Sequence, residues 1–296
     1  MEQWMEKGYA KINLHLDVTG RLEGGYHRVE TVMQSLSLHD EVTLTLTEGE
    51  NIAVTCDVEG VPLDEKNLAV RAANLFFDAL GVRRGLLLDI KKRIPLAAGM
   101  AGGSADAAAV LRGLNHLFER PFSQEVLCEL GSKLGADVPF CIVGGTAYAD
   151  GRGDRLHPFP TMPDCYILCA CEGESVSTPW AYSILDQEFD NFREGGAYVP
   201  RGVDSLRNAL RTGNVEKIGG ALFNIFEEPV LSRRPVAARI RQLLLASGAI
   251  ASMMSGSGPS VFGIFADEAG RDRAIKALRA ESFRTYPCHP IETVKR

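Results

Sequence analysis

The sequence predicts a protein of mixed strands and helices in two domains. Strand-like alternating segments come first and helical patterns follow them. A cluster of glycine, proline and aspartate interrupts the chain at residues 151–163, and helices with a strand–turn–strand pattern come after it. The 296 residues are enough for two modest domains or one large one, and such a shift in composition marks a domain boundary. We therefore place the boundary within this cluster.

The first strand is predicted at residues 9–18, where apolar and polar residues alternate strictly. Lys11, Asn13 and His15 fall on its polar face, and residues 24–27 (Gly-Gly-Tyr-His) follow a turn shortly afterwards. This surface either faces solvent or holds a polar ligand. Before the boundary we further predict strands at residues 29–38, 40–47, 52–58, 86–90 and 141–148, and helices at residues 67–80 and 123–134. A third helix is predicted to follow the glycine-rich loop and to end near Phe118.

After the boundary, short apolar runs and helical periodicity alternate. Strands are predicted at residues 166–171, 250–254, 260–265 and near Thr285, and helices at residues 203–210, 215–226, 234–245 and 268–280. Residues 186–202 read as a long surface connection, because acids, glycines and aromatics mix there without periodicity.

Composition excludes several classes of protein. The apolar fraction of 45% supports a core, yet no run approaches the roughly 18 apolar residues that a membrane helix needs. The start of the chain is polar and acidic, unlike a signal peptide, and the seven cysteines follow no framework spacing. The net charge of −6 argues against a protein that binds nucleic acid by neutralising phosphates. We expect a cytoplasmic protein with reduced thiols and neither nucleic-acid nor membrane partners.

Residues 94–114 form a loop of small residues and glycines between a strand and an alanine-rich helix. Small side chains allow a ligand to approach the backbone, and the N–H groups at a helix start attract anions. The spacing matches neither G-x-x-x-x-G-K-[ST] nor G-x-G-x-x-G, so P-loop and dinucleotide-binding interpretations fail. A nucleotide phosphate fits this loop, but an ordinary strand-to-helix connection explains the pattern equally well. An anion would also need a local basic patch, for which Lys11 and residues 91–93 are candidates.

Two further segments have both a structural and a chemical interpretation. Asp137 lies in a segment that leaves a predicted helix, where it either caps a turn or accepts a proton from an attacking hydroxyl. An aspartate is a weak base for an alcohol, so it would need a cation beside it, and Lys11 could supply one. Residues 255–258 (Ser-Gly-Ser-Gly) form either a plain hairpin turn or a second backbone approach to phosphate.

Cys165, Cys169 and Cys171 fall on one face of a predicted strand. Zinc would need a fourth ligand, and neither His157 nor Cys141 has a suitable spacing. We interpret the three cysteines as buried free thiols and predict no metal site built from protein ligands. Mg²⁺ is expected to arrive with the nucleotide.

Five segments, taken in order, resemble the GHMP kinase superfamily; they are residues 10–16, 25–27, 94–108, 134–140 and 254–258. The resemblance implies a two-domain α+β fold with a cleft between the domains. Residues 1–158 would form a ribosomal-S5-domain-2-like, ATP-binding domain and residues 159–296 a ferredoxin-like domain. We expect a monomer or a weak homodimer.

The resemblance also implies an activity and a set of site residues. The Ala-Lys-Ile-Asn-Leu and Gly-Tyr-His segments are similar to those of GHMP kinases that phosphorylate the 2-hydroxyl of a cytidine diphosphate-linked methylerythritol, with ATP and Mg²⁺, in non-mevalonate isoprenoid synthesis. Asp137 would then be the base and Lys11 the cation beside it. Tyr26 and Tyr182 would enclose the cytosine ring and His27 would read its edge, while Asn13 and Thr178 would contact the erythritol and diphosphate. Asn67 would lie near the adenine, and the ATP phosphates would be held by Pro95, Leu96, Ala97, Ala98, Gly99, Met100, Ala101, Gly102, Gly103, Ser104 and Ala105.

Two departures from the family pattern affect these expectations. Ala101 and Ala105 stand where the superfamily loop often has glycine and serine, which removes a freely left-handed position and a hydroxyl. The segment from Asn224 to Glu227 lacks a family acid, so we assign it no catalytic role.

The alternatives are another GHMP kinase of a small alcohol such as homoserine, a dinucleotide-dependent oxidoreductase, and a non-enzymatic S5-like protein that binds nucleic acid. The Gly-Tyr-His segment argues against homoserine, which has no base to recognise. The glycine loop lacks an acid about 20 residues downstream at a strand end, which argues against the oxidoreductase. The acidic charge balance argues against nucleic acid.

Overall fold

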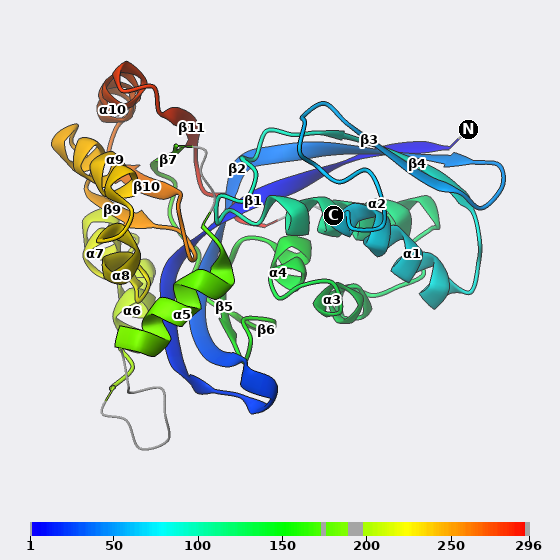
Figure 1. Ribbon diagram of the computed structural model, residues 1–296, viewed down its shortest axis with the longest axis horizontal. Helices are drawn as coiled ribbons and strands as arrows, with labels where there is room; N and C mark the ends of the chain where they lie inside the picture. The colour runs from blue at the N-terminus through cyan, green and yellow to red at the C-terminus, as the bar shows by residue number, and fades with distance from the viewer. Residues whose placement is uncertain (1, 173–175, 189–197, 294–296) are drawn as a thin grey trace.

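The computed structural model describes residues 2–172, 176–188 and 198–293, which build two sheets with helices packed against them (Figure 1). The first sheet has the order β3-β4-β2-β1-β8, with β5 paired to β2 and β6 to β5. Its strands are β1 (Gln3–Arg21), β2 (His27–Thr47), β3 (Ile52–Cys56), β4 (Gly85–Lys91), β5 (Thr146–Asp150), β6 (Arg155–Pro158) and β8 (Phe223–Asn224). The second sheet has the order β11-β7-β10-β9 and contains β7 (Tyr166–Cys171), β9 (Ala251–Met254), β10 (Val261–Phe265) and β11 (Arg284–Cys288).

The helices form two groups, one for each sheet (Figure 1). On the first sheet pack α1 (Leu68–Leu80), α2 (Gly102–Leu117), α3 (Gln124–Ser132) and α4 (Val138–Val143), with α2 directly against β1 and β2. Beside the second sheet lie α6 (Asp204–Thr212), α7 (Val215–Gly220), α8 (Glu227–Leu231), α9 (Pro235–Ala246) and α10 (Glu268–Ala280). Helices α9 and α10 cover this sheet directly. Helix α5 (Thr178–Glu188) packs on the part of the β1–β2 ribbon that contains Leu16, Val18 and Val29.

One hydrophobic core continues from the first sheet into the second. Leu14 and Met33 of the first sheet belong to the same buried cluster as Ile167 and Phe262 of the second. The end of the chain also returns to the first sheet, where the Ser37 N–H donates to the carbonyl of His289. The two sheets are therefore joined by packing as well as by the chain itself, which fixes the geometry of any site between them.

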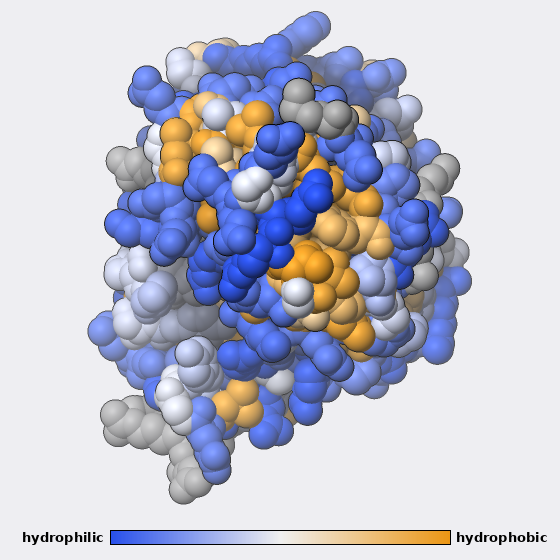
Figure 2. All heavy atoms as spheres, turned by 90° about the vertical axis from the view of Figure 1, so that its right-hand side faces the viewer, coloured by the Kyte–Doolittle hydropathy of each residue, from blue (hydrophilic) through white to orange (hydrophobic). Residues whose placement is uncertain are grey.

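The far end of the first sheet, on the right of Figure 1, is less completely covered. Figure 2 shows hydrophobic side chains at the centre of this end, surrounded by hydrophilic ones. Trp4 stacks on His116 of α2 and remains partly exposed, as do Met5 and Leu87. No helix in the described part of the chain is long and apolar enough to cross a membrane.

Strands β1 and β2 form a long antiparallel ribbon whose register shifts between Tyr9 and Lys11, between Asn13 and His15, and between Val18 and Gly20. A shift of this kind adds a residue to one strand and redirects the side chains that follow it. Leu14 consequently has no partner in the register, and His15 is turned away from Lys11 and Asn13. The expectation that His15 shares their ligand-facing surface is wrong, because its ring is 1% exposed and packs 5.4 Å from the ring of Phe223.

Most predicted elements are confirmed, although the strands predicted at residues 29–38 and 40–47 form the single strand β2, and neither β6 nor α8 was predicted. Two further predictions differ. The predicted strand at residues 141–148 is wrong: the chain stays helical to Val143, and β5 begins only at Thr146, because Gly144 and Gly145 adopt positive φ between them. The predicted helix at residues 215–226 ends at Gly220, after which Phe223 and Asn224 pair with β1.

Helix α5 was not predicted, and it includes residues 186–188 of the predicted surface connection. Residues 189–197 of that connection lie outside the described residues. The division into domains at residue 158 remains our proposal. Its support is that every strand of the first sheet except β8 ends at or before Pro158.

Close approach of α2 to β1 depends on small residues on both elements. Ala105, Ala107 and Ala108 of α2 are fully buried. A Cβ atom added at Gly8 of β1 would lie 2.7 Å from the carbonyl oxygen of Ala105. Backbone atoms cannot move aside as a flexible side chain can, so the helix and strand would have to separate.

We therefore predict that Gly8→Ala lowers the free energy of unfolding by roughly 1–3 kcal/mol, the usual range for overpacking. Gly220→Ala is the matched control, because nothing lies within 4 Å of the added Cβ. Urea denaturation monitored by circular dichroism measures both variants. Equal stability of the two variants would contradict the close packing of α2 on β1.

Candidate active site

A cavity of about 1040 Å³ lies where the two halves of the molecule meet. Its walls are formed by β1 and β2, by the loop before α2, by the start of α4, by α5 and by the turn between β9 and β10. Lys11, Asn13 and Asp137 line it together with Thr178 and Tyr182. Segments far apart in the sequence therefore converge on one hollow.

Lys11 and Asp137 meet in this cavity. The Lys11 Nζ atom donates to Asn13 Oδ1 at 2.8 Å and lies 3.8 Å from Asp137 Oδ2. The lysine side chain is 5% exposed, whereas that of Asp137 is 39% exposed and opens to the cavity. Asp137 stands at the N-cap position of α4, yet its carboxylate makes no capping hydrogen bond. The capping interpretation of Asp137 is therefore wrong, and its carboxylate remains available to a ligand.

The glycine-rich loop before α2 has a strained backbone and is packed from two sides. Ala97, Gly99 and Ala101 all adopt positive φ, and the Lys11 N–H donates to the carbonyl of Met100 at 3.2 Å. A Cβ atom at Gly99 would lie 2.6 Å from the carbonyl oxygen of Ser255. The loop is thus held between β1 and the turn at residues 255–258, which joins β9 to β10 and also lines the cavity.

Not every predicted phosphate-binding residue reaches the cavity. Those that line it are Ala97, Ala98, Gly99, Ala101, Gly102, Gly103 and Ser104. Met100 and Ala105 are buried in the core, so their side chains contact no ligand. A hydroxyl at position 105 would face the core, and its loss does not alter the cavity. Pro95 and Leu96 line a second cavity of about 370 Å³, which is shared with Tyr286 of the second sheet.

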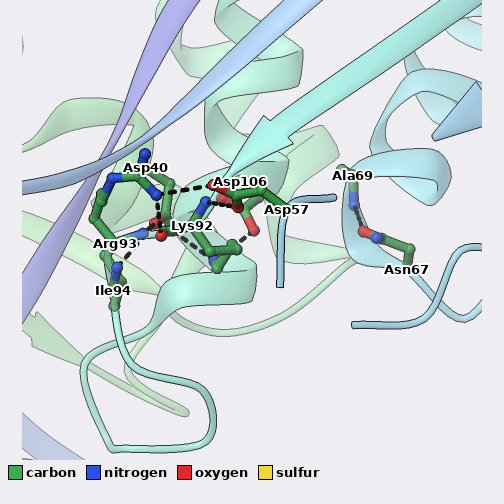
Figure 3. Close-up of polar contacts among 8 residues, drawn as sticks. All are labelled: Asp40, Asp57, Asn67, Ala69, Lys92, Arg93, Ile94 and Asp106. Atoms are coloured by element: carbon green, nitrogen blue, oxygen red, sulfur yellow. Dashed lines mark hydrogen bonds and ion pairs between the residues drawn. The ribbon is translucent and has the colours of Figure 1, made fainter. Parts of the chain in front are cut away.

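The side chain of Asn67 caps helix α1. Its Oδ1 accepts from the N–H of Ala69 at 2.9 Å, which caps α1 (Figure 3). Its Nδ2 donates to the carbonyl of Pro62 at 2.7 Å. The amide does not line the larger cavity, although its neighbour Leu68 does. These two bonds hold the start of α1 in place. The expected position of Asn67 near the adenine stays a prediction.

A buried ion cluster anchors the base of the loop (Figure 3). Lys92 Nζ donates to Asp40 Oδ2 at 2.5 Å and to Asp106 Oδ2 at 2.7 Å. The second oxygen of Asp40 accepts from the backbone N–H groups of Arg93 and Ile94. The cluster joins β2, the end of β4 and the first turns of α2. The loop therefore begins and ends on atoms held by the same ammonium group.

Charge and burial act against each other in this cluster. Burial raises the pKa of Asp106 to about 7, although the ammonium of Lys92 acts to lower it. Burial alone would lower the pKa of Lys92, but the two carboxylates raise it above its ordinary value. The expectation that residues 91–93 offer a basic patch to the ligand is wrong, because none of them lines the larger cavity and Lys92 is already paired.

The other end of the cavity is aromatic. The rings of His27 and Tyr182 stack with centroids 4.5 Å apart, and the edge of Tyr182 packs on Phe226. Burial raises the pKa of Tyr182 to about 12, so this ring stays neutral. Tyr26 is exposed and lies 5.7 Å from the guanidinium of Arg152. His27 and Tyr182 thus form a stacked aromatic pair at this end of the cavity, and Tyr26 lines the same cavity.

Sequence reasoning missed the polar partners of these residues. Asp186 Oδ1 lies 2.9 Å from His27 Nε2 and 2.6 Å from Arg21 Nη2. Asp186 follows Tyr182 by four residues, and this helical spacing would have identified it had α5 been predicted. Thr31 lines the cavity beside Asn13 and belongs to no motif. Thr178 donates to or accepts from Ser257 of the opposite turn at 3.1 Å.

The predicted cysteine face of β7 is buried. Cys165, Cys169 and Cys171 are free thiols, and burial raises the pKa of Cys165 to about 12. No group of three or more His, Cys, Asp or Glu side chains among the described residues could hold a metal ion.

Comparisons with known proteins identify the family of this chain. Residues 67–145 match the GHMP kinases N terminal domain and residues 206–284 the GHMP kinases C terminal domain. The 4-diphosphocytidyl-2-C-methyl-D-erythritol kinase of Caldicellulosiruptor bescii is 40% identical over 92% of this chain and 93% of its own. The kinase of the same name from Bacillus subtilis is 40% identical over 97% and 96% of the two chains.

Solved structures agree as well. A crystal structure of 4-(cytidine 5'-diphospho)-2C-methyl-D-erythritol kinase is similar with a TM-score of 0.81 and 32% identity, over 97% of this chain and 99% of that one. Homoserine kinase from Cytophaga hutchinsonii, at 20% identity, shares the fold with a TM-score of 0.72, over 98% and 96% of the two chains. The chain therefore belongs to the GHMP kinases, and within them to the family of 4-diphosphocytidyl-2-C-methyl-D-erythritol kinases. The expected α+β GHMP kinase fold is confirmed.

Ala101 provides a direct test of the loop geometry. It precedes α2 with φ of 59° and ψ of 30°, a conformation that strains any residue with a Cβ atom. We predict that Ala101→Gly raises the free energy of unfolding by about 0.5–1 kcal/mol, because the relief of strain exceeds the added entropy of the unfolded chain. Ala107→Gly, inside α2, should lower it by about 1 kcal/mol. Thermal unfolding of both variants measures the difference, and losses of similar size would disprove the left-handed loop.

Proposed function

We propose that the chain transfers the γ-phosphate of ATP to the 2-hydroxyl of 4-diphosphocytidyl-2-C-methyl-D-erythritol, giving the 2-phosphate and ADP, as a step of isoprenoid synthesis. Family membership supports the class of reaction. The observation that carries the proposal is the 3.8 Å approach of Lys11 Nζ to Asp137 Oδ2 in a cavity that also contains the start of α2. A base, a cation and an anion-binding helix end are the parts that phosphoryl transfer to an alcohol requires.

The phosphates of ATP would lie at the N-terminus of α2. Gly102, Gly103 and Ser104 open this 16-residue helix and line the cavity, so their backbone N–H groups can point at an anion. The helix dipole favours negative charge at the same place. Small side chains allow the phosphate oxygens to approach the backbone closely. Stabilising charge that spreads over the transferred group is the main contribution a protein makes to this reaction.

Mg²⁺ would enter with ATP. This cation prefers oxygen ligands and is usually held by one or two side chains together with the substrate phosphates. The Ser104 hydroxyl lines the cavity at the start of α2 and would supply one such oxygen beside the phosphates. When bound, Mg²⁺ neutralises charge on the phosphate oxygens.

Asp137 would accept the proton of the 2-hydroxyl as the oxygen forms its bond to the γ-phosphorus and the bond to the ADP oxygen breaks. The ammonium of Lys11 stabilises the developing alkoxide, which allows a weak carboxylate base to suffice. Lys11 is held beside Asp137 by its bond to Asn13, so the pair is assembled before substrate binds. General bases typically contribute about 10²- to 10⁴-fold to the rate.

The cytidine part would occupy the aromatic end of the cavity. Tyr26 and Tyr182 offer flat faces to the base, and the His27 ring, held at Nε2 by Asp186, would lie at its edge. Asn13 and Thr178 line the space between this end and Asp137, where the erythritol and diphosphate would lie.

We predict that Asp137→Asn lowers kcat by about 10²- to 10⁴-fold while ATP still binds, because the amide keeps the shape but accepts no proton. Turnover is measured by coupled ADP release and ATP binding by calorimetry. Asp204→Asn is the control, since Asp204 is an exposed residue of α6 outside the cavity. Near-normal turnover of Asp137→Asn would remove Asp137 from the role of base.

The proposed substrate is tested in the same assay with unaltered protein. ADP release should require 4-diphosphocytidyl-2-C-methyl-D-erythritol and should remain at background with homoserine. Equal release with homoserine would disprove recognition of the cytidine group. Background release with both alcohols, in the presence of ATP and Mg²⁺, would disprove the proposed reaction.

A further inference from the structure

A chain of buried hydrogen bonds runs behind Lys11. Lys11 Nζ donates to Asn13 Oδ1 at 2.8 Å, and Asn13 Nδ2 donates to Thr31 Oγ1 at 2.8 Å. The Thr31 hydroxyl in turn donates to the backbone carbonyl of His15 at 2.7 Å. Lys11, Asn13 and Thr31 are all buried. The chain therefore begins at the proposed catalytic cation and ends on a fixed atom of β1.

Every bond in this chain has only one possible direction. An ammonium group donates and cannot accept, so Asn13 must present its oxygen to Lys11. The Asn13 amide nitrogen then faces Thr31, and it too can only donate. Thr31 has one hydroxyl proton, which it gives to the His15 carbonyl, and its oxygen lone pairs remain to accept from Asn13. The orientation of the Asn13 amide is thus set from both sides, by the ammonium of Lys11 at its oxygen and by the Thr31 hydroxyl at its nitrogen.

The strands place Thr31 where this is possible. In the register of β1 with β2, Thr31 lies opposite Leu16, and Asn13 lies opposite Met33. The register shift between Asn13 and His15 brings the His15 carbonyl within reach of the Thr31 hydroxyl. The same register shift thus turns the His15 ring away from the cavity and allows the Thr31 hydroxyl to bond to the His15 carbonyl.

We propose that Thr31 is a positioning residue for Lys11 and acts through Asn13; this inference rests on the proposed kinase function. Thr31 holds the Asn13 oxygen toward Lys11, and the Asn13 oxygen holds Nζ beside Asp137. Without the hydroxyl, the Asn13 nitrogen faces no acceptor, and a rotated amide would turn N–H groups toward the ammonium. Lys11 would then move away from the hydroxyl that is phosphorylated.

Thr31→Val tests this directly, because valine keeps the branched shape and loses the hydroxyl. We expect kcat to fall roughly 10- to 100-fold with the KM for ATP nearly unchanged, since small displacements of a catalytic group have effects of this size. Thr31→Ser keeps the hydroxyl and should retain kcat within about threefold of the unaltered enzyme. Thr146→Val is the matched control, because it removes a threonine hydroxyl that bonds Gln34 on the same sheet without lining the cavity.

A double-mutant cycle separates positioning from a general loss of structure. If Thr31 acts through Asn13, Thr31→Val should lower kcat little further in an Asn13→Ala background. Losses that multiply fully in the double variant would overturn the proposal, as would a Thr31→Val enzyme with normal kcat or a Thr31→Ser enzyme as slow as Thr31→Val.

The proposal also has a readout that does not depend on turnover. The side-chain amide resonances of Asn13, assigned by their loss in Asn13→Ala, should shift in Thr31→Val and stay in place in Thr31→Ser. Unshifted resonances in Thr31→Val would overturn the inference even if the enzyme were inactive. If the unaltered enzyme releases no ADP but the Asn13 resonances shift in Thr31→Val as expected, the proposed function is wrong. The coupling between Thr31 and Asn13 would still hold.

Discussion

The ammonium of Lys92, clamped between Asp40 and Asp106, is the interaction on which the site depends most. It joins the strand before the glycine-rich loop to the helix after it, and Asp40 also fixes the backbone of Arg93 and Ile94. A loop of small residues has little side-chain packing of its own to define its shape. Its two ends must therefore be fixed from outside, and a buried charge cluster does so with short, directional bonds.

The other contacts of the glycine-rich loop fix its position relative to the residues proposed to act in catalysis. Met100 accepts from the backbone of Lys11, which sets the loop against β1, while Gly99 packs on the turn at residues 255–258. The start of α2, Lys11 and a turn of the second sheet are thereby held in one arrangement. Asp137 completes it from the start of α4. Each of the four parts comes from a different element, so the cavity exists only when both halves of the chain are folded together.

Local patterns in the sequence predicted many of the residues that line the site, but not which distant residues they contact. Alternation at residues 9–18 indicated a strand bearing Lys11 and Asn13, and small residues indicated the anion-binding helix start. The cluster around Lys92 was not foreseen, since a run of basic residues gives no sign that one of them is buried against two distant aspartates. Strand β8 was not predicted either, because the pairing of Phe223 and Asn224 with β1 is a tertiary contact that overrides the local helical periodicity. The redirection of His15 arose from a register shift, which is set by strand pairing and leaves no mark in the alternation.

The most direct measurement compares Lys92→Met with Lys91→Met, in which the neighbouring lysine is exposed. Removing one partner of a buried ion cluster typically lowers the free energy of unfolding by about 3–5 kcal/mol, whereas an exposed change stays within about 0.5 kcal/mol. We expect Lys92→Met to be destabilised by this larger amount and, below its unfolding temperature, to bind ATP more weakly than Lys91→Met does. Equal stability and equal ATP affinity of the two variants would contradict this expectation.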